Sequence, residues 1–408
     1  MSYWTGALIA VLFLAFALGS RKLSSSVVTG PMLFAGFGFL IGPQLLGWVN
    51  LEISNQVIHT IAEVTLVVVL FTDAASTDFK LFRQSRNLPL RMLLIGMPLT
   101  VGLGMLAALG LFPDWSLWEA ALLAAILTPT DAALGQAVTE NETIPDRIRT
   151  AIVSESGLND GLALPLVVLF AALAAGGSND GTAYWVESVG SQIILGPLVG
   201  IAIGYCGGRL VALADEHGWM SEWAEGIAAM AVALAAFMLA EAVQGNGFLA
   251  AFAGGLAFGK GLGRKCRFLH QFQQTEAHML VLTTFTLVGA MLLPAAMQHF
   301  TWNCLLFSLF ALTLMRMLPI TLSLAGLQLG VHTVAFIGWF GPRGLASVLF
   351  LLIVMQGTDL AREAELLAAV ALTVTLSIIL HGITAAPWAR IYGRACGDGA
   401  QAATEPEL

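Results

Sequence analysis

Two carboxylates and an amide lie within residues 154–161 (SESGLNDG), inside a run of apolar residues long enough to cross a bilayer. An ionised side chain at the bilayer centre costs about 2.5 to 3.5 kcal/mol on insertion scales, so such residues usually serve a function. Asp160 prefers to be neutral there unless a cation or a hydrogen-bond donor is near. The same carboxylate could hold either a proton or a cation, and this competition would couple the movements of the two.

Two further apolar segments contain residues that break helices. The sequence Thr-Pro-Thr-Asp occupies residues 128–131, and Gly-Trp-Phe-Gly-Pro-Arg-Gly occupies residues 338–344. Proline removes a backbone donor and clashes with the preceding turn, and glycine weakens a helix further. Both segments therefore predict helices that break within the membrane, where the freed backbone groups must be buried in protein or line a cavity.

The candidate ligands around Asp160 are all oxygens, which a hard monovalent cation prefers. We expect the cation ligands to be the following four residues: Asp160, Ser156, Thr130 and Asp131. Ser156 lies one helical turn before Asp160 and shares its face. Asn159 could orient the pathway or ligate through its amide oxygen. Each has a plainer alternative: Ser156 could bond its own i−4 carbonyl, Asn159 could bond a neighbouring helix, and Asp131 could neutralise the N-terminus of a half-helix.

Three other charged residues have predicted roles. Asp73 ends the third apolar run, where it could collect cations at the mouth of a pathway or be a simple helix-end charge. Glu155 and Arg343 both lie within apolar segments, so each needs a partner. We expect these two to form a structural ion pair between the sixth and twelfth spans. Glu63 and Glu241 also lie within spans, and the sequence assigns them no role.

The composition is that of an all-α polytopic membrane protein. The mean hydropathy is +0.82, and only 11% of the residues are charged, against about 25% in a soluble domain. About 20 apolar residues cross a membrane. On that rule we expect about thirteen transmembrane helices, at roughly 4–20, 27–47, 54–73, 89–111, 117–138, 148–175, 187–213, 222–243, 245–262, 275–298, 302–324, 330–356 and 364–388. The four cysteines are scattered, and no basic patch indicates a nucleic-acid partner.

The broken fifth and twelfth helices occupy corresponding positions in two halves, which is the sequence pattern of an inverted-repeat transporter. The transmembrane domain is expected at 1–395, with repeats at about 1–175 and 222–390 and a linker helix at about 187–213. Residues 396–408 are expected to be a short disordered cytoplasmic tail without a regulatory domain. The distribution of Lys and Arg places the N-terminus outside and the C-terminus in the cytoplasm.

These residues resemble the signature of the monovalent cation/proton antiporters, in the NhaP-type and eukaryotic sodium/proton exchanger branch. Asn159-Asp160 is similar to its Asn-Asp motif, Thr130-Asp131 to its unwound Thr-Asp, and Arg343-Gly344 to its Arg-Gly. Asp73 stands where a glutamate is more usual. The resemblance implies a six-helix core that moves against a dimerisation domain, a homodimer, and Asp160 as the shared proton and cation site. It carries over Ser156, Thr130, Asp131 and Asp73 as ligands or near-ligands.

The sequence therefore predicts a secondary antiporter, most simply of Na⁺ against H⁺, in the inner cell membrane and without a cofactor. In this branch Asn159 replaces the first of two adjacent aspartates found in electrogenic relatives, which implies electroneutral exchange. A K⁺/H⁺ antiporter, a K⁺ efflux system and a cation channel remain alternatives. An intramembrane hydrolase using Ser156 is disfavoured because no histidine or lysine base lies at a suitable spacing.

Overall fold

The computed structural model consists of helices joined by turns and loops, with no strand among the residues it describes. These residues are 3–23, 27–48, 56–76, 87–131, 134, 138, 141, 144–175, 182–264, 275, 278–358 and 360–402. The helices of the N-terminal half are α1 (Tyr3–Leu23), α2 (Gly30–Ile41), α3 (Gln56–Ala75), α5 (Asn87–Arg91), the π-helical turn η1 (Met92–Gly96), α6 (Met97–Leu111), α7 (Leu117–Ile126) and α9 (Asp146–Ala175). A long helix, α10 (Thr182–Glu216), follows.

The second half has a similar succession of helices. It comprises α11 (Glu222–Ala242), α12 (Gly247–Leu262), α14 (His278–Leu287), the π-helical turn η3 (Val288–Leu292), α15 (Leu293–Gln298), α16 (Trp302–Leu312), α17 (Leu314–Ser323), α18 (Val331–Trp339), α19 (Leu345–Gly357) and α20 (Glu363–Ala402). Each predicted span therefore contains helix, although α2 and α7 end before the predicted ends of their spans, at Ile41 and Ile126. Among the described residues, seven helices are long and apolar enough to cross a membrane, and the count of thirteen stays a prediction.

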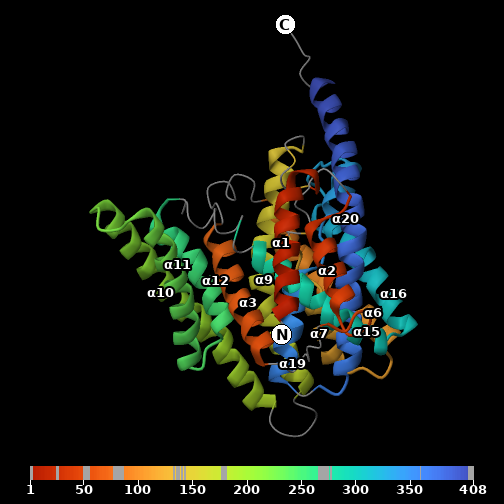
Figure 1. Cartoon of the computed structure of the whole chain (residues 1–408), viewed down its shortest axis with the longest axis horizontal. Coiled ribbons are helices and arrows are strands. Elements are labelled where there is room, and N and C mark those ends of the chain that lie inside the picture. Colours follow the sequence, from red (N-terminus) through yellow and green to blue (C-terminus); the bar gives the residue numbers. More distant parts are fainter. Residues whose placement is uncertain are drawn as a thin grey trace.

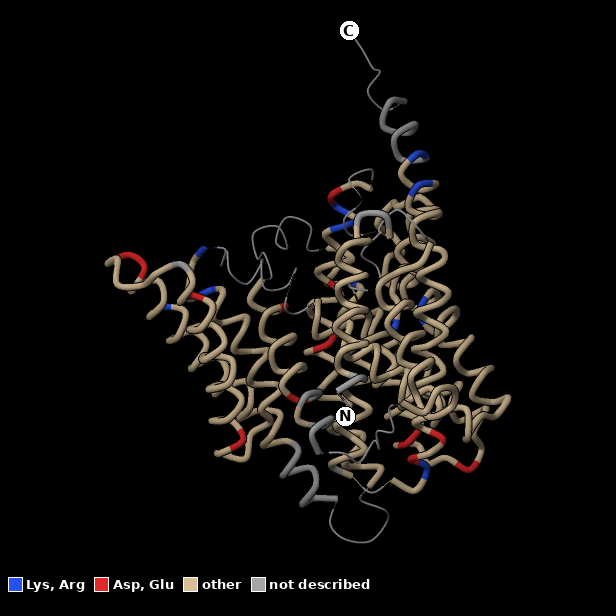
Figure 2. The backbone as a smooth tube through the Cα atoms, viewed as in Figure 1, with Lys and Arg blue, Asp and Glu red and all other residues tan. Residues whose placement is uncertain are grey.

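The helices form one bundle in which α9 lies between two groups (Figure 1). On one side α10 packs against α11 and α12, and α12 packs against α3; on the other side α6 packs against α7, and α16 against α20. Large apolar side chains cover much of the outer surface, and Leu18 is 82% exposed. Most Lys and Arg positions lie toward the end from which the C-terminus projects (Figure 2). This distribution is the one that the positive-inside rule describes.

The C-terminal segment differs from its expected form. Instead of disorder from residue 396, α20 continues as helix to Ala402. Once a helix is formed, each added residue costs little because it brings its own hydrogen bond. Residues 403–408 lie outside the described part of the chain.

Glycines allow α10 and α12 to approach backbone to backbone. A methyl group at Gly200 would overlap the carbonyl oxygen of Ala250, and one at Gly204 would overlap that of Gly254. Small residues at such contacts are the usual means of packing helices in a membrane, where lipid removes the hydrophobic driving force. The two helices therefore form one closely packed unit.

We expect Gly204→Val to destabilise the protein by about 1–3 kcal/mol, because the side chain has no space and the backbones must separate. The measurement is the thermal unfolding midpoint of the purified protein in detergent. Gly190→Val on the same helix is the matched control, because a methyl group there meets no atom within 4 Å. Equal midpoints for the two variants would contradict the close contact.

The fourth and eleventh spans, α5 to α6 and α16 to α17, are joined at both ends. At one end Arg91 Nη1 donates to the carbonyl oxygen of Ala325, beyond the end of α17, at 2.6 Å. At the other end Asn303 Nδ2, in the first turn of α16, donates to the carbonyl oxygen of Leu111 at 2.8 Å. The first turn of each span thus satisfies a free carbonyl at the end of the other.

Candidate functional site

Two interrupted helices cross in the middle of the bundle. The chain leaves α7 at Ile126, ahead of Pro129, and α18 is separated from α19 by residues 340–344. The backbone N–H of Asp131 donates to the carbonyl oxygen of Pro342 at 2.8 Å, so the two breaks are hydrogen-bonded to each other. The predicted break in the twelfth span is confirmed. In the fifth span the helix ends where predicted, and most residues between 132 and 143 lie outside the described part.

Each of the two interrupted spans also caps a helix end in the other span. The Asp131 carboxylate accepts a hydrogen bond of 2.8 Å from the N–H of Leu345, the first residue of α19. The Ser347 hydroxyl donates at 2.8 Å to the carbonyl oxygen of Ile126, the last residue of α7. A negative group at a helix N-terminus interacts favourably with the helix dipole, and a donor at a C-terminus satisfies a free carbonyl, so both contacts stabilise the helix ends. The expected alternative role of Asp131, at a half-helix N-terminus, is therefore present in the geometry.

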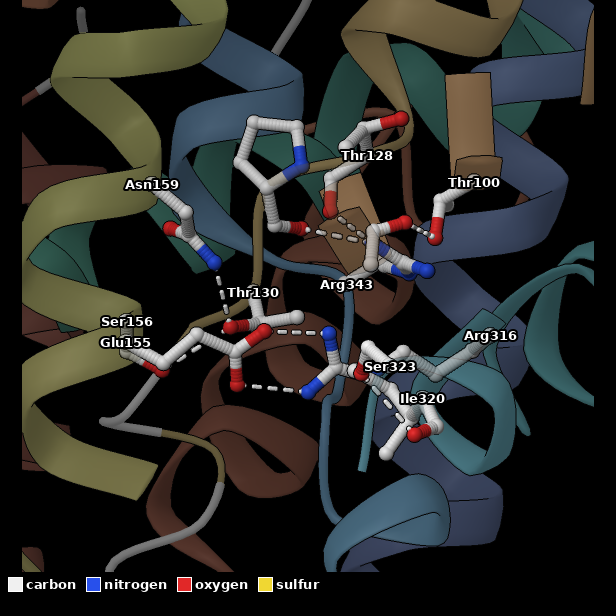
Figure 3. A network of polar contacts seen from close by, with 12 residues as sticks. Thr100, Thr128, Thr130, Glu155, Ser156, Asn159, Arg316, Ile320, Ser323 and Arg343 are labelled. Carbon is white, nitrogen blue, oxygen red and sulfur yellow. Dashed lines mark hydrogen bonds and ion pairs between the residues drawn. The ribbon is translucent and has the colours of Figure 1, made fainter. Parts of the chain in front are cut away.

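Arg343 is fully buried in the second break and holds the first one (Figure 3). Its Nη1 donates to the carbonyl oxygens of Thr128 and Pro129, the latter at 3.2 Å. Its backbone N–H donates to the Ser377 hydroxyl of α20 at 2.7 Å. Nε and Nη2 have no hydrogen-bond partner among the described residues. The guanidinium thus supplies donors to two carbonyls that lack helical partners because α7 has ended at Ile126.

The ion pair expected between Glu155 and Arg343 is wrong in its partner. Glu155 forms a two-fold pair with Arg316 of α17, in which Nη2 lies 2.6 Å from Oε2 and Nη1 contacts Oε1. Both side chains are buried, with 5% and 3% of their surface exposed for Arg316 and Glu155. Arg343 is instead occupied by backbone carbonyls, and Gly341 leaves room for the Arg316 guanidinium, which a methyl group would overlap. The pair therefore joins the sixth and eleventh spans.

Three buried polar side chains meet beside Asp160. The Thr130 hydroxyl lies 2.9 Å from the Ser156 hydroxyl and accepts a hydrogen bond of 2.7 Å from Asn159 Nδ2. Ser156 and Asn159 come from α9, and Thr130 comes from the break after α7 (Figure 3). Thr130 therefore connects the unwound segment to the helix that bears Asp160.

One side-chain oxygen on each of two consecutive residues of α9 is available to accept a hydrogen bond or to bind a ligand. Asn159 Oδ1 and Asp160 Oδ1 are buried and have no hydrogen-bond partner among the described residues. Buried oxygens without a donor are costly. A cation would satisfy either oxygen, and a proton would satisfy the carboxylate of Asp160. The carboxylates of Asp73 and Asp131 lie close enough to interact electrostatically with that of Asp160. Acids from α3, α9 and the α7 break thus converge, and this arrangement can bind a positive charge.

Asp160 lies where α9 meets the group of helices that contains α12. A methyl group at the next residue, Gly161, would overlap the ring of Phe252 of α12. Helix α9 also contacts α3 and α10. The candidate cation site is therefore beside a contact between the two helix groups.

Three residues of the surrounding network were not foreseen as site residues: Arg316, Ser377 and His381. Arg316 and His381 are ionisable residues inside apolar runs, which is itself a signal of function. Their partners depend on how the helices are rotated, which spacing alone does not give. Glu241, unassigned from the sequence, accepts a hydrogen bond of 2.7 Å from the N–H of Gly247 and so anchors the turn between α11 and α12.

Comparisons with known proteins all indicate one family. The family model described as "Sodium/hydrogen exchanger, transmembrane" matches residues 7–391. The chain is 27% identical over 350 residues to the K⁺/H⁺ antiporter NhaP of Alkalimonas amylolytica, covering 84% of this chain and 59% of that protein. It is 26% identical over 354 residues to the Na⁺/H⁺ antiporter 2 of Zygosaccharomyces rouxii, covering 82% of this chain and 43% of that protein.

Among solved structures, the sodium/proton antiporter MjNhaP1 of Methanocaldococcus jannaschii superposes with a TM-score of 0.74 at 19% identity, over 94% of this chain and 98% of that one. At this identity the likeness establishes the fold. The chain spans less than two thirds of the length of the two curated relatives, 59% and 43%.

Proposed function

Because the chain belongs to the transmembrane sodium/hydrogen exchanger family, we propose that it exchanges a monovalent cation for H⁺ across the membrane. This is a family of transporters, not of enzymes, and the chain is an integral membrane protein. The observation that carries the proposal is the buried Asp160 Oδ1, which has no hydrogen-bond partner among the described residues. It lies beside the hydroxyls and amide of Thr130, Ser156 and Asn159. One carboxylate that holds either a proton or a cation suffices for coupling.

We propose that Asp160, Ser156, Thr130 and Asp131 contribute the cation ligands, with Asn159 holding Thr130 in place and Asp73 attracting cations. When the cation leaves, a proton on Asp160 removes the repulsion from Asp73 and Asp131. Both loaded forms neutralise the aspartate charge, so either can cross the low-dielectric layer between the two helix groups. No cofactor takes part in this cycle.

Na⁺ is the first candidate for the cation, and K⁺ is the second. The ligands are all oxygens, which suit either ion. Of the two curated relatives, one is named as a K⁺/H⁺ antiporter and the other as a Na⁺/H⁺ antiporter. With Asn159 beside a single exchangeable acid, we propose one cation per proton and hence electroneutral exchange.

The proposed assembly is a homodimer in the inner cell membrane, with the N-terminus outside and the C-terminus in the cytoplasm. The proposed transmembrane domain covers residues 1–395, with inverted repeats at about 1–175 and 222–390 and a linker within α10. The reciprocal contacts of Arg91 and Asn303 support this symmetry, because they relate the fourth and eleventh spans by an exchange of ends.

The test is cation-induced dequenching of a pH-sensitive dye in proteoliposomes, with Na⁺ and K⁺ added separately. We expect a signal with at least one of them and none in protein-free vesicles. The signal should be unchanged when an ionophore clamps the membrane potential at different values. Cation flux without proton movement from folded protein would instead indicate a channel, and a response to the potential would exclude one-to-one exchange.

Removing only the Thr130 hydroxyl should weaken cation binding. We expect Thr130→Val to raise the half-saturating cation concentration about tenfold, because the Asn159 amide and the Ser156 hydroxyl lose a buried partner worth about 1–2 kcal/mol. The measurement is the same dequenching assay over a range of cation concentrations. Thr100→Val is the matched control, since among the described residues this buried hydroxyl bonds only the carbonyl oxygen of Gly96 in its own span, at 2.9 Å. Equal half-saturation for both variants would remove Thr130 from the ligand set.

A further inference from the structure

Helix α20 bears a buried polar stripe, of which Ser377 and His381 contact the break in the twelfth span and Thr373 contacts Ser308 of α16. Thr373, Ser377 and His381 follow one another at intervals of four residues, so they share one face of the helix. Their side chains are 0%, 0% and 1% exposed. A histidine in this position must find partners for both ring nitrogens, because water does not reach it.

Both ring nitrogens of His381 have hydrogen-bond partners. Nε2 lies 3.0 Å from the carbonyl oxygen of Trp339, the last residue of α18, and since a carbonyl only accepts, Nε2 donates. Nδ1 lies 3.1 Å from the Ser377 hydroxyl and also 3.1 Å from the Ser377 carbonyl oxygen; with the ring proton on Nε2, Nδ1 accepts from the hydroxyl. The Ser377 oxygen then accepts the backbone N–H of Arg343 at 2.7 Å. In this series of hydrogen bonds, with the ring proton on Nε2, each donor has an acceptor.

This series of hydrogen bonds begins and ends on opposite sides of the break at residues 340–344. Trp339 is the last residue before the interruption of the twelfth span, and Arg343 lies almost at its end. The Trp339 indole gives a further attachment to α20, since its Nε1 donates to the Thr384 hydroxyl at 2.9 Å. Side chains of α20 therefore set the distance between the two ends of the break. None of these hydrogen bonds is made to a proposed cation ligand.

We propose that Ser377 and His381 are positioning residues for cation binding, which hold the break at Trp339 and Arg343 and, through Arg343, the unwound segment that carries Thr130. The inference rests on the proposed function. Its last steps are on adjacent residues: Arg343 Nη1 binds the carbonyls of Thr128 and Pro129, and the next residue, Thr130, contacts Ser156 and Asn159. Loosening the break lets the Thr130 hydroxyl move away from Asp160.

The experiment measures cation binding to the purified full-length protein by calorimetry, with NaCl or KCl titrated against a choline background, together with dequenching in proteoliposomes. The variants are Ser377→Ala, His381→Leu and His381→Gln. Glutamine can place a donor near the position of Nε2, so it should restore part of what leucine loses. Thr375→Val is the matched control, because within the described part of the chain this hydroxyl of α20 bonds only the Ala371 carbonyl of its own helix, at 2.7 Å.

We expect Ser377→Ala and His381→Leu to raise the cation dissociation constant about three- to tenfold, because each variant removes buried hydrogen bonds that hold the break. Thr375→Val should match the wild type, and His381→Gln should lie between leucine and wild type. Ser377→Ala removes a single oxygen and decides the matter if His381→Leu does not fold. Unchanged dissociation constants in folded variants, even with a lowered unfolding midpoint, would overturn the positioning role.

The two proposals fail in different ways. A wild type that binds a cation but moves no protons would overturn the antiport alone, and the variants would still test the positioning role by calorimetry. A wild type that transports, with variants that bind normally, would overturn the positioning role alone. A wild type that neither binds nor transports would overturn both.

Discussion

Asp160→Asn is expected to abolish cation-dependent proton movement at every cation concentration. Asparagine has the same shape but can neither take up a proton nor neutralise a cation. The carboxylate is the centre of the candidate site, since its Oδ1 has no protein partner in the described residues and two further acids act on it. Dequenching of the pH-sensitive dye in proteoliposomes measures the loss, which should be complete within the error of protein-free vesicles.

Folding must be separated from transport in this variant. The substitution removes a buried negative charge from a group of three acids, so we expect the unfolding midpoint to stay equal or to rise. Asp146→Asn provides a control for the loss of one acid from α9, because the Asp146 side chain is 86% exposed. Residual exchange by a well-folded Asp160→Asn protein would show that the shared carboxylate lies elsewhere.

Arg316→Met is expected to destabilise the protein by about 3–5 kcal/mol, because it leaves Glu155 buried and without its cation. The pair is bidentate and almost fully buried, which is the geometry in which removal of one partner is most costly. The unfolding midpoint in detergent and the yield of monodisperse protein measure the effect. The double variant Glu155→Gln, Arg316→Met should recover part of the loss, because no unpaired charge remains.

A surface ion pair gives the matched comparison for Arg316. Arg362 and Glu365 lie 3.4 Å apart, with 39% and 37% of their side chains exposed. Exposed pairs contribute little to stability, so Arg362→Met should shift the midpoint only slightly. If Arg316→Met and Arg362→Met proved equally mild, the Glu155–Arg316 pair would not stabilise the bundle.

The positions of the helices could be predicted from the sequence because apolar runs of about 20 residues have few other uses. Even the short, glycine-rich segment at 245–262 is helical, as α12. The break at Pro342 was predictable for a local reason, since proline and glycine both oppose helix. The break between α16 and α17 was not: Thr313 has φ −115° and ψ −94°, yet it is neither glycine nor proline.

The partner of Glu155 was not predictable for a related reason. Two arginines lie within apolar runs, Arg316 and Arg343, and hydropathy treats them alike. The choice depends on the rotation of α17 after the irregular turn at Thr313. It also depends on the carbonyls of Thr128 and Pro129, which lie beyond the end of α7 and bind Arg343. By contrast, Thr130, Ser156 and Asn159 were expected near Asp160 because Ser156 and Asn159 share its helix and the break delivers Thr130. Their roles as ligands stay predictions.

The reciprocal contacts between the fourth and eleventh spans bear on how the molecule can deform. Arg91 bonds the two spans at one end and Asn303 bonds them at the other. We therefore expect the two spans to move as one rigid unit, without sliding along each other or changing their crossing angle. With Arg316 on one of these spans and Glu155 on α9, this rigid unit extends to the helix of Asp160. We therefore expect relative movement of the two helix groups to occur where Gly161 of α9 contacts the ring of Phe252 of α12, next to Asp160.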